Sequence, residues 1–373
     1  MSSSKNSKLY GFLFVAIFVV QQILSFVWKT FTLVSPYWIA IILVTLVVGF
    51  KLPLKKYSAS EAFKFTLVCA ICSIPTFLNG TSPGEVVVKI FYIFAAYFGF
   101  ILLNEKRIEL KWFDLLLLIL YVFFYNAYFS KDIVTRLSLN GDLFGHSSSN
   151  TIAISLNIVL WFYYVLNQAY GGANSKKLLL FSIVNLVLIV IQGSRAGIIV
   201  ALLLLLLIAV ANFNVQQKRT KYLVYVIVFA GAFYLISRAL PMLEGLVDIT
   251  NMQGVSSYEE DVRSLAQASF FNKLDFSSAL IGYDYKYEFV GDITRTFNAF
   301  LDFWKTFGLL PMIFLMVGIV KRIVRRDKYK VSLLCLTPII AYSFVESLWG
   351  GTFWDVIIFI CLFWPKNSPI FYE

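Results

Sequence analysis

The sequence predicts an all-α integral membrane protein with about twelve transmembrane helices and both termini in the cytoplasm. The chain of 373 residues is 59% hydrophobic and only 14% charged, whereas about a quarter of the residues in a water-soluble domain are charged. Apolar runs long enough to cross a hydrocarbon core of about 30 Å recur along almost the whole chain. Basic residues gather in alternate short loops. We therefore expect a single polytopic membrane domain over residues 1–373.

The apolar runs define the expected spans. They cover residues 9–28, 33–50, 62–78, 86–103, 112–129, 151–168, 178–192, 195–213, 222–240, 298–320, 331–348 and 352–364. The first run follows Lys5 and Lys8, but it is too long for the apolar part of a signal peptide and no small-x-small site follows it. It is therefore expected to be an uncleaved helix.

The distribution of Lys and Arg sets the expected orientation. With a cytoplasmic N-terminus, the basic residues concentrate in the inner loops, and only Lys29, Lys131, Arg136 and Arg195 fall in short outer loops. An imbalance of this kind in short loops determines topology. It also explains the net charge of +11 without a nucleic-acid partner, because the basic residues anchor the chain at the anionic inner leaflet.

A long outer loop, residues 241–297, separates the ninth and tenth expected spans. A connection of about 57 residues in a compact bundle is usually functional or disordered. Its segment "YEEDVRSLAQASFFNKL" (258–274) places Val262, Leu265, Ala266 and Phe270 at helical spacing, which predicts an amphipathic helix at the outer surface. We therefore expect any chemistry to face outward.

An arginine stands at the outer start of the eighth expected span. In "VIQGSRAGIIV" (190–200), Gly193 allows a tight turn, Ser194 can cap the helix, and Arg195 occupies its first turn. A helix N-terminus favours an anion, and a guanidinium adds a fixed charge with a planar set of donors. The stretch therefore predicts an anion site.

The sixth expected span starts in a similar way. It follows "FGHSSSNT", where Ser149 or Asn150 can cap the helix, with Arg136 and His146 just before it. His146 is the only histidine, and it is equally well interpreted as a polar loop residue or as a proton shuttle or phosphate contact near neutral pH.

The tenth expected span repeats the arrangement, with Thr294 or Thr296 as the cap beside Arg295. Each arginine alone is explained by an apolar stem that covers the interface while its head reaches water. However, arginine at a helix N-terminus opposes the macrodipole, and outer positive charge opposes the topology rule. Three such starts therefore predict a negative partner, such as a diphosphate at the membrane surface.

Other polar residues give weaker signals. Asp302 and Lys305 stand three apart in an apolar run and can pair with each other, while Glu346 is a functional candidate because it is ionisable at membrane depth. All four cysteines lie in apolar spans, so neither a disulfide nor a zinc site is expected. We find no metal-ligand spacing, P-loop or dinucleotide fingerprint, and expect no metal and no cofactor.

Four sequence islands, in order, resemble the O-antigen polymerase and ligase superfamily of polytopic bacterial membrane glycosyltransferases. They are "RLSLNGDLFGHSSSNTIAISL" (136–156), "QGSRAGIIVALLLLLL" (192–207), "VRSLAQASFFNKL" with "LIGYDY" (262–285), and "TRTFNAFLDFWKTFGLLPMIFL" (294–315). The resemblance covers about residues 130–320. It implies that the site is lined by Arg136, Asn150, Arg195, Arg263 and Asn298. Ligases of this superfamily usually carry a histidine where this chain has Phe297, so the resemblance is greater to the polymerase.

The resemblance implies an enzyme of lipopolysaccharide biosynthesis in the bacterial inner membrane, with its active site facing the periplasm. The growing glycan leaves undecaprenyl diphosphate for a sugar hydroxyl of another lipid-linked repeat unit, and a chain-length regulator is a further expected partner. Arg195 and Arg263 would stabilise the leaving diphosphate, and a carboxylate would act as base. The candidate bases are Glu288, Asp284 and Asp292. The substrate-binding set adds His146, Ser194, Arg295 and Tyr283.

Two other functions compete with the polymerase. The first is a ligase that moves glycan onto lipid A core or a protein. The second is a flippase or other transporter of lipid-linked oligosaccharide, which twelve spans and a basic cavity would suit. Transporters bind their substrates near the membrane midplane, often on broken helices, whereas the candidate residues here gather at the outer surface.

Overall fold

The computed structural model describes most of ten helices and their connections. The described residues are 16–17, 20–21, 23–24, 39, 41–43, 59–87, 90–92, 95, 111–129, 149–169, 175–192, 194–212, 253–284, 287–291, 294–324, 333–346 and 357. All regular elements in these ranges are helices, and no β-strand occurs among them. The expected spans 9–28, 33–50, 86–103, 222–240 and 352–364 fall mostly outside the described residues.

Two of the described helices are long and apolar enough to cross a membrane. One is α5 (Lys111–Phe129), and the other is the segment Asn150–Gln168 of α7 (Ser149–Ala169). Shorter apolar segments run over Ala196–Ala209 and Leu309–Val320. The expectation of a helical protein is therefore confirmed for the described residues, and two membrane-length helices are present among them.

The chain divides into two compact units. Unit 1 comprises residues 1–112, 262–329 and 343–373, and unit 2 comprises residues 113–261 and 330–342. Three helices cross these divisions: α5, α11 (Gln253–Asn272) and α15 (Leu333–Val345). Each unit has its own helix packing.

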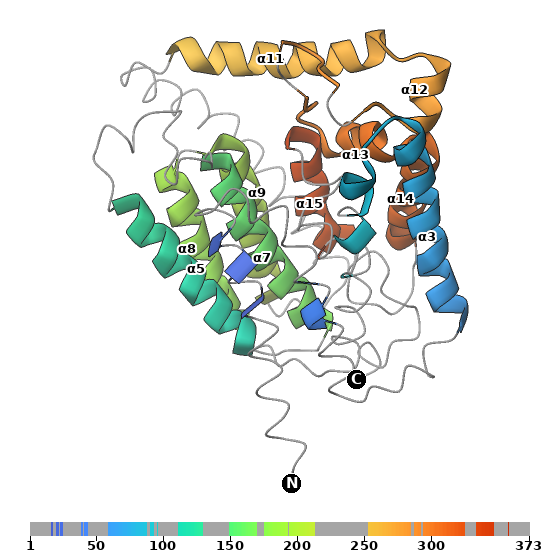
Figure 1. Ribbon diagram of the computed structural model, residues 1–373. Helices are drawn as coiled ribbons and strands as arrows, with labels where there is room; N and C mark the ends of the chain where they lie inside the picture. The colour runs from blue at the N-terminus through green and yellow to red at the C-terminus, as the bar shows by residue number, and fades with distance from the viewer. Residues whose placement is uncertain are drawn as a thin grey trace. The chain divides into compact units, whose positions relative to one another are not determined.

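Unit 2 is a bundle in which α7, α8 (Ser175–Gln192) and α9 (Arg195–Asn212) pack side by side, with α5 against them (Figure 1). The helix α7 is buried along residues 152–167. Aromatic rings join α5 to α7, since Phe113 stacks on Tyr163 at 5.9 Å between ring centroids and meets Phe162 edge-on at 5.7 Å. The core of unit 2 therefore centres on α7.

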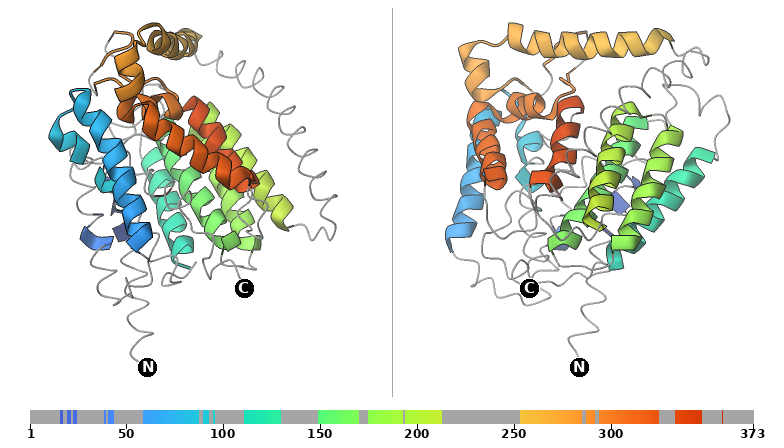
Figure 2. Two further views of the ribbon diagram at one scale, coloured as in Figure 1. Left: turned by 90° about the vertical axis from the view of Figure 1, so that its right-hand side faces the viewer. Right: turned by 180° about the vertical axis from the view of Figure 1, so that it is seen from behind.

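Unit 1 contains α3 (Ala59–Leu78), α12 (Phe276–Ile281), α13 (Ala299–Phe307) and α14 (Leu309–Val324), together with α11 from Val262 onward. The helices α12, α13 and α14 all pack against α3 (Figure 2).

Six expected spans agree with observed helices within about three residues at each end. These spans cover residues 62–78, 112–129, 151–168, 178–192, 195–213 and 331–348. Helix ends fray, so differences of a residue or two in their assignment are usual.

The expected span 298–320 is instead two helices. Gly308, with φ of 80°, ends α13 by donating its N–H to the Trp304 carbonyl, and α14 starts at the next residue. A Cβ at this position would lie 2.2 Å from the Leu280 carbonyl oxygen. Only glycine permits both this conformation and this close approach, so the prediction of one continuous helix was wrong.

The amphipathic helix expected over 258–274 is α11. Its Ala266 and Phe270 are fully buried and form a cluster with Tyr283 and Phe289, as helical spacing predicted for the first two. Leu265 lies on the other side and is exposed. The helix therefore uses its Ala266 and Phe270 face to hold the segment that follows it.

Candidate functional site

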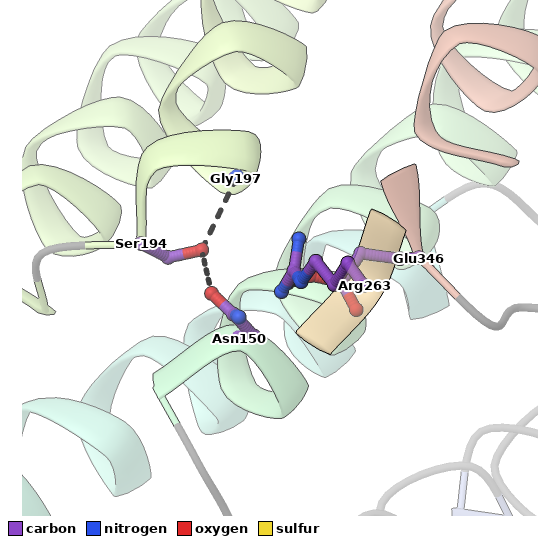
Figure 3. A network of polar contacts seen from close by, with 5 residues as sticks. All are labelled: Asn150, Ser194, Gly197, Arg263 and Glu346. Carbon is purple, nitrogen blue, oxygen red and sulfur yellow. Dashed lines mark hydrogen bonds and ion pairs between the residues drawn. The ribbon is translucent and has the colours of Figure 1, made fainter. Parts of the chain in front are cut away.

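Arg263 and Glu346 form an ion pair in unit 1 (Figure 3). Arg263 Nη2 lies 3.4 Å from Glu346 Oε1, and the Arg263 guanidinium carbon lies 5.3 Å from the centre of the Phe297 ring. The Arg263 side chain is 27% exposed and that of Glu346 is 9% exposed. Three segments distant in sequence therefore meet here: the middle of α11, the residues before α13, and the end of α15.

The geometry of the Arg263–Glu346 contact indicates a modest contribution to stability. Ion pairs with good access to water contribute about 1 kcal/mol or less, and a contact of 3.4 Å through one nitrogen is long for a charged hydrogen bond. Taking a carboxylate out of water costs several kcal/mol. The Arg263–Glu346 contact alone offsets part of that cost, and both residues make further interactions.

Phe297 and Asn298 shape the middle of this cluster. Phe297 has a φ of 55° and is the only non-glycine residue with positive φ in the part of the chain that the structure describes. Asn298 is the N-cap of α13 and accepts hydrogen bonds from Phe300 N at 3.0 Å and Leu301 N at 3.2 Å. Its Nδ2 also donates to the Phe344 carbonyl at 3.5 Å. Backbone strain of this kind concentrates at functional sites.

Thr294 and Thr296, the predicted caps of this helix, do not cap it. Thr296 is buried, and both its backbone N and its Oγ1 donate to Asp302 Oδ1 at 2.8 Å. The Thr294 carbonyl accepts a hydrogen bond from Lys305 Nζ. The prediction was wrong because Asn298, the first residue before α13, takes the capping role while the threonines serve the loop.

Asp302 and Lys305 hold that loop against α13. Lys305 Nζ donates to the Tyr287 carbonyl at 3.2 Å as well as to that of Thr294, and lies 5.1 Å from the Phe289 ring centre. Both charged side chains are buried. The two side chains, whose spacing suggested mutual pairing, thus tie Tyr287, Thr294 and Thr296 to the helix.

A second polar group lies in unit 2, where α7 meets α9 (Figure 3). Ser194 Oγ accepts from Gly197 N at 3.2 Å, which confirms Ser194 as the cap of α9, and donates to Asn150 Oδ1 at 2.8 Å. Asn150 lies inside the first turn of α7, which starts at Ser149. Asn150 therefore bonds across to α9 through its side chain.

The contact continues along the bundle as a chain of side-chain amides. Asn157 Nδ2 donates to the Gly197 carbonyl at 2.9 Å, and Asn185 Nδ2 donates to Asn157 Oδ1 at 2.9 Å. A Cβ at Gly197 would lie 2.5 Å from Ala153 Cβ. Small residues and amide hydrogen bonds are how apolar helices associate closely, so this network fixes the start of α9, whose first residue is Arg195.

The remaining predicted site residues fall into three groups. Asp284, Glu288 and Arg295 are exposed in unit 1. Tyr283 is buried, and its hydroxyl donates to the Phe270 carbonyl at 2.9 Å, so it serves the core of the loop in this structure. Residues outside the described part are Arg136, His146 and Asp292, and of Arg195 only the backbone is described.

The sequence, through its family resemblance, predicted Arg263 and Asn298 in one site, and in the structure the ring of Phe297, which precedes Asn298, lies 5.3 Å from the Arg263 guanidinium carbon. It had not paired Glu346 with Arg263. The available signal was an acid next to an apolar run, but its partner is 83 residues away. Among the described residues, no group of three or more His, Cys, Asp and Glu side chains could hold a metal ion.

Comparison with known proteins gives no relative. No protein-family model, no curated protein and no solved structure matches the chain.

Proposed function

We propose that the protein is a metal-independent O-antigen polymerase of the bacterial inner membrane, with about twelve spans and a periplasmic active site. It transfers a growing glycan from undecaprenyl diphosphate to a sugar hydroxyl of another lipid-linked repeat unit. The observation that carries the proposal is the partly buried guanidinium of Arg263, held by Glu346 and the ring of Phe297.

A guanidinium in this setting suits a diphosphate. Its planar donors match two phosphate oxygens, and partial burial strengthens its electrostatic interaction with an anion relative to bulk water. Arg263 has an anionic neighbour in Glu346, so a diphosphate would share or replace that partner. The Phe297 ring centre lies 5.3 Å from the guanidinium carbon, which allows a cation–π contact.

The reaction needs charge stabilisation and one proton transfer. The acceptor hydroxyl oxygen forms a bond to the anomeric carbon of the donor sugar, and the bond from that carbon to the diphosphate oxygen breaks. The bonding electrons leave with undecaprenyl diphosphate, whose growing negative charge Arg263 stabilises. The hydroxyl proton passes to a carboxylate, for which Glu288 and Asp284 are exposed candidates on the same segment of unit 1.

Phe297 favours a polymerase over a ligase. The resemblance places a histidine at this position in ligases, and a phenyl ring can neither accept nor donate a proton. In this chain the ring contributes a face to the Arg263 guanidinium instead.

A second candidate is a transporter of lipid-linked oligosaccharide. The break between α13 and α14 at Gly308 and the buried asparagines Asn157 and Asn185 are observations in its favour, because transporters place substrates at broken helices and intramembrane polar groups. The Arg263 cluster lies before α13 rather than at the break, which favours the enzyme.

Reconstitution with substrate distinguishes the two. The purified full-length protein in proteoliposomes, supplied with a lipid-linked repeat unit, is expected to produce a ladder of longer glycans and free undecaprenyl diphosphate. Gel electrophoresis and mass spectrometry would measure both products. If only the single repeat is recovered while labelled lipid crosses the bilayer, the transporter is correct and the polymerase is not.

A further inference from the structure

The short helix α12 exposes an apolar face. Phe276 is 82% exposed and Leu280 is 44% exposed. Residues four apart lie on the same side of a helix, so both side chains point the same way. A phenyl ring this exposed on an ordered helix is available to an apolar partner.

Several hydrogen bonds hold α12, which carries the exposed Phe276, in a fixed position. Asp275 and Ser278 form a reciprocal capping box at its start, and the hydrogen bonds from Ser278 lower the pKa of Asp275. Trp304 Nε1 donates to the Ala279 carbonyl at 2.8 Å, and Asn79 Nδ2 donates to the Ile281 carbonyl at 3.2 Å. The apolar face is therefore presented in a defined position.

The helix α12 lies at one end of α3 and α14, within unit 1 (Figures 1 and 2). Asn79 follows the last residue of α3, and Gly308 precedes α14 and approaches the Leu280 carbonyl. Both larger helices carry exposed apolar stripes at helical spacing near this end. The stripes are Ile74, Phe77 and Leu78 on α3, and Leu310, Ile313, Phe314 and Val317 on α14.

The size of the face identifies the occupant. Fully burying an exposed Phe or Leu side chain is worth about 1.5–3 kcal/mol, and Leu280, already more than half buried, would gain only part of this. A stable protein partner needs about 800 Å² on each side, and two side chains on a helix of six residues present much less. Continuity with the apolar stripes of α3 and α14 points to lipid.

We propose that the Phe276 and Leu280 face of α12 inserts into the boundary between headgroups and acyl chains of the outer leaflet. This inference rests on the membrane location in the proposed function, since α3 and α14 then face lipid with the same stripes. The anchor would set the depth of the segment that follows α12, including Asn298 and the other residues around Arg263.

Photo-crosslinking tests the anchor directly. The photoreactive residue p-benzoylphenylalanine would replace Phe276 or Leu280 in the full-length protein, reconstituted in phosphatidylethanolamine and phosphatidylglycerol vesicles. The matched controls replace Asp284 or Glu288, which are exposed charged positions of the same segment. Variants that elute like the parent protein in size-exclusion chromatography would be illuminated, and mass spectrometry would count phospholipid adducts.

We expect phospholipid adducts at 276 and 280 to exceed those at 284 and 288 by at least about fivefold, because benzophenone reacts only with groups in contact. Equal yields at all four positions, or covalent dimers at 276 in place of lipid adducts, would overturn the anchor. The ladder assay is run on the parent protein, because Asp284 and Glu288 are the candidate bases, and it is therefore independent of this result. An active protein without adducts refutes the anchor alone, whereas adducts on an inactive protein refute the polymerase alone.

Discussion

At Phe297 the chain adopts a backbone conformation that L-residues avoid. A left-handed φ on a residue with a Cβ costs roughly 1–2 kcal/mol, so the surrounding contacts must hold it. Thr296 on one side is bonded to Asp302, and Asn298 on the other caps α13. The result is a ring placed 5.3 Å from the Arg263 guanidinium. We infer that the strain serves to hold that guanidinium in place.

Two substitutions of Phe297 distinguish the contribution of its aromatic ring from that of an apolar side chain alone. Phe297→Tyr keeps an aromatic face and is expected to retain activity within about twofold. Phe297→Leu loses the face, and because a cation–π contact is worth about 0.5–2 kcal/mol, kcat/KM for ladder formation should fall about 2- to 30-fold. Initial rates over a range of repeat-unit concentrations would measure this. A Leu variant as active as the parent would show that the ring has no role.

The sequence predicted the roles of some individual residues and missed others. Ser194 was identified as a cap because a hydroxyl directly before an apolar run has a local signature. Glu346 as the partner of Arg263, and Asn298 as the cap in place of Thr294 or Thr296, depend on tertiary contacts. Asn298 caps α13 because Thr296 is already bonded to Asp302, which no local pattern reveals.

Among the elements, the helices α7, α8 and α9 pack unusually closely at Gly197. A methyl group there would meet Ala153 Cβ, Ser194 Oγ and Ile189 Cγ2 within 3.0 Å. Gly318 in α14 is the opposite case, since no atom lies within 4 Å of a Cβ added there. Alanine at Gly318 is therefore a control for alanine at Gly197 in the same protein.

Thermal unfolding of both alanine variants in detergent tests this packing. Gly197→Ala is expected to lower the free energy of unfolding by about 1–3 kcal/mol through overpacking. Gly318→Ala should leave it unchanged or raise it by up to about 1 kcal/mol, because alanine favours helix. Equal Tm values for the two variants would contradict the close contact at Gly197.

Helix positions were predictable where polar residues punctuate apolar runs, as at Ser194 before α9. The break at Gly308 was missed because "FGLLP" (307–311) is apolar on both sides of the glycine, although a glycine followed by Pro311 is a known helix-end signal. The reason for the break is the Leu280 carbonyl, 28 residues earlier, which approaches too closely for any side chain. A contact of that range leaves no periodic signal.

For the whole molecule, the predicted site residues divide between the two units. Asn150 and Ser194 belong to unit 2, while Arg263, Asn298 and Glu346 belong to unit 1. The Arg263 guanidinium, its counter-ion Glu346 and the α13 cap Asn298 all lie in unit 1. The composition predicted a membrane protein, because a chain that is 59% hydrophobic and 14% charged has too few polar side chains to cover its apolar surface in water. The length of the apolar runs predicted that the spans are helices.

The most direct test is the affinity of the purified protein for undecaprenyl diphosphate. Arg263→Ala should weaken binding about 10- to 100-fold, because a charged hydrogen bond is worth about 1.5–3 kcal/mol. That change alone removes one partner of a buried carboxylate, so an Arg263→Ala/Glu346→Ala double variant controls for lost stability. Lys273→Ala removes a positive charge just after α11, away from the described Arg263 contacts, and should bind like the parent.

Native mass spectrometry or a fluorescent-lipid titration would give the Kd values. The proposal predicts that both variants lacking Arg263 lose affinity to the same extent, while Glu346→Ala alone keeps or strengthens it, because the guanidinium charge is then offset less. Unchanged Kd values for both variants that lack Arg263, beside the Lys273→Ala control, would contradict a diphosphate site at this guanidinium.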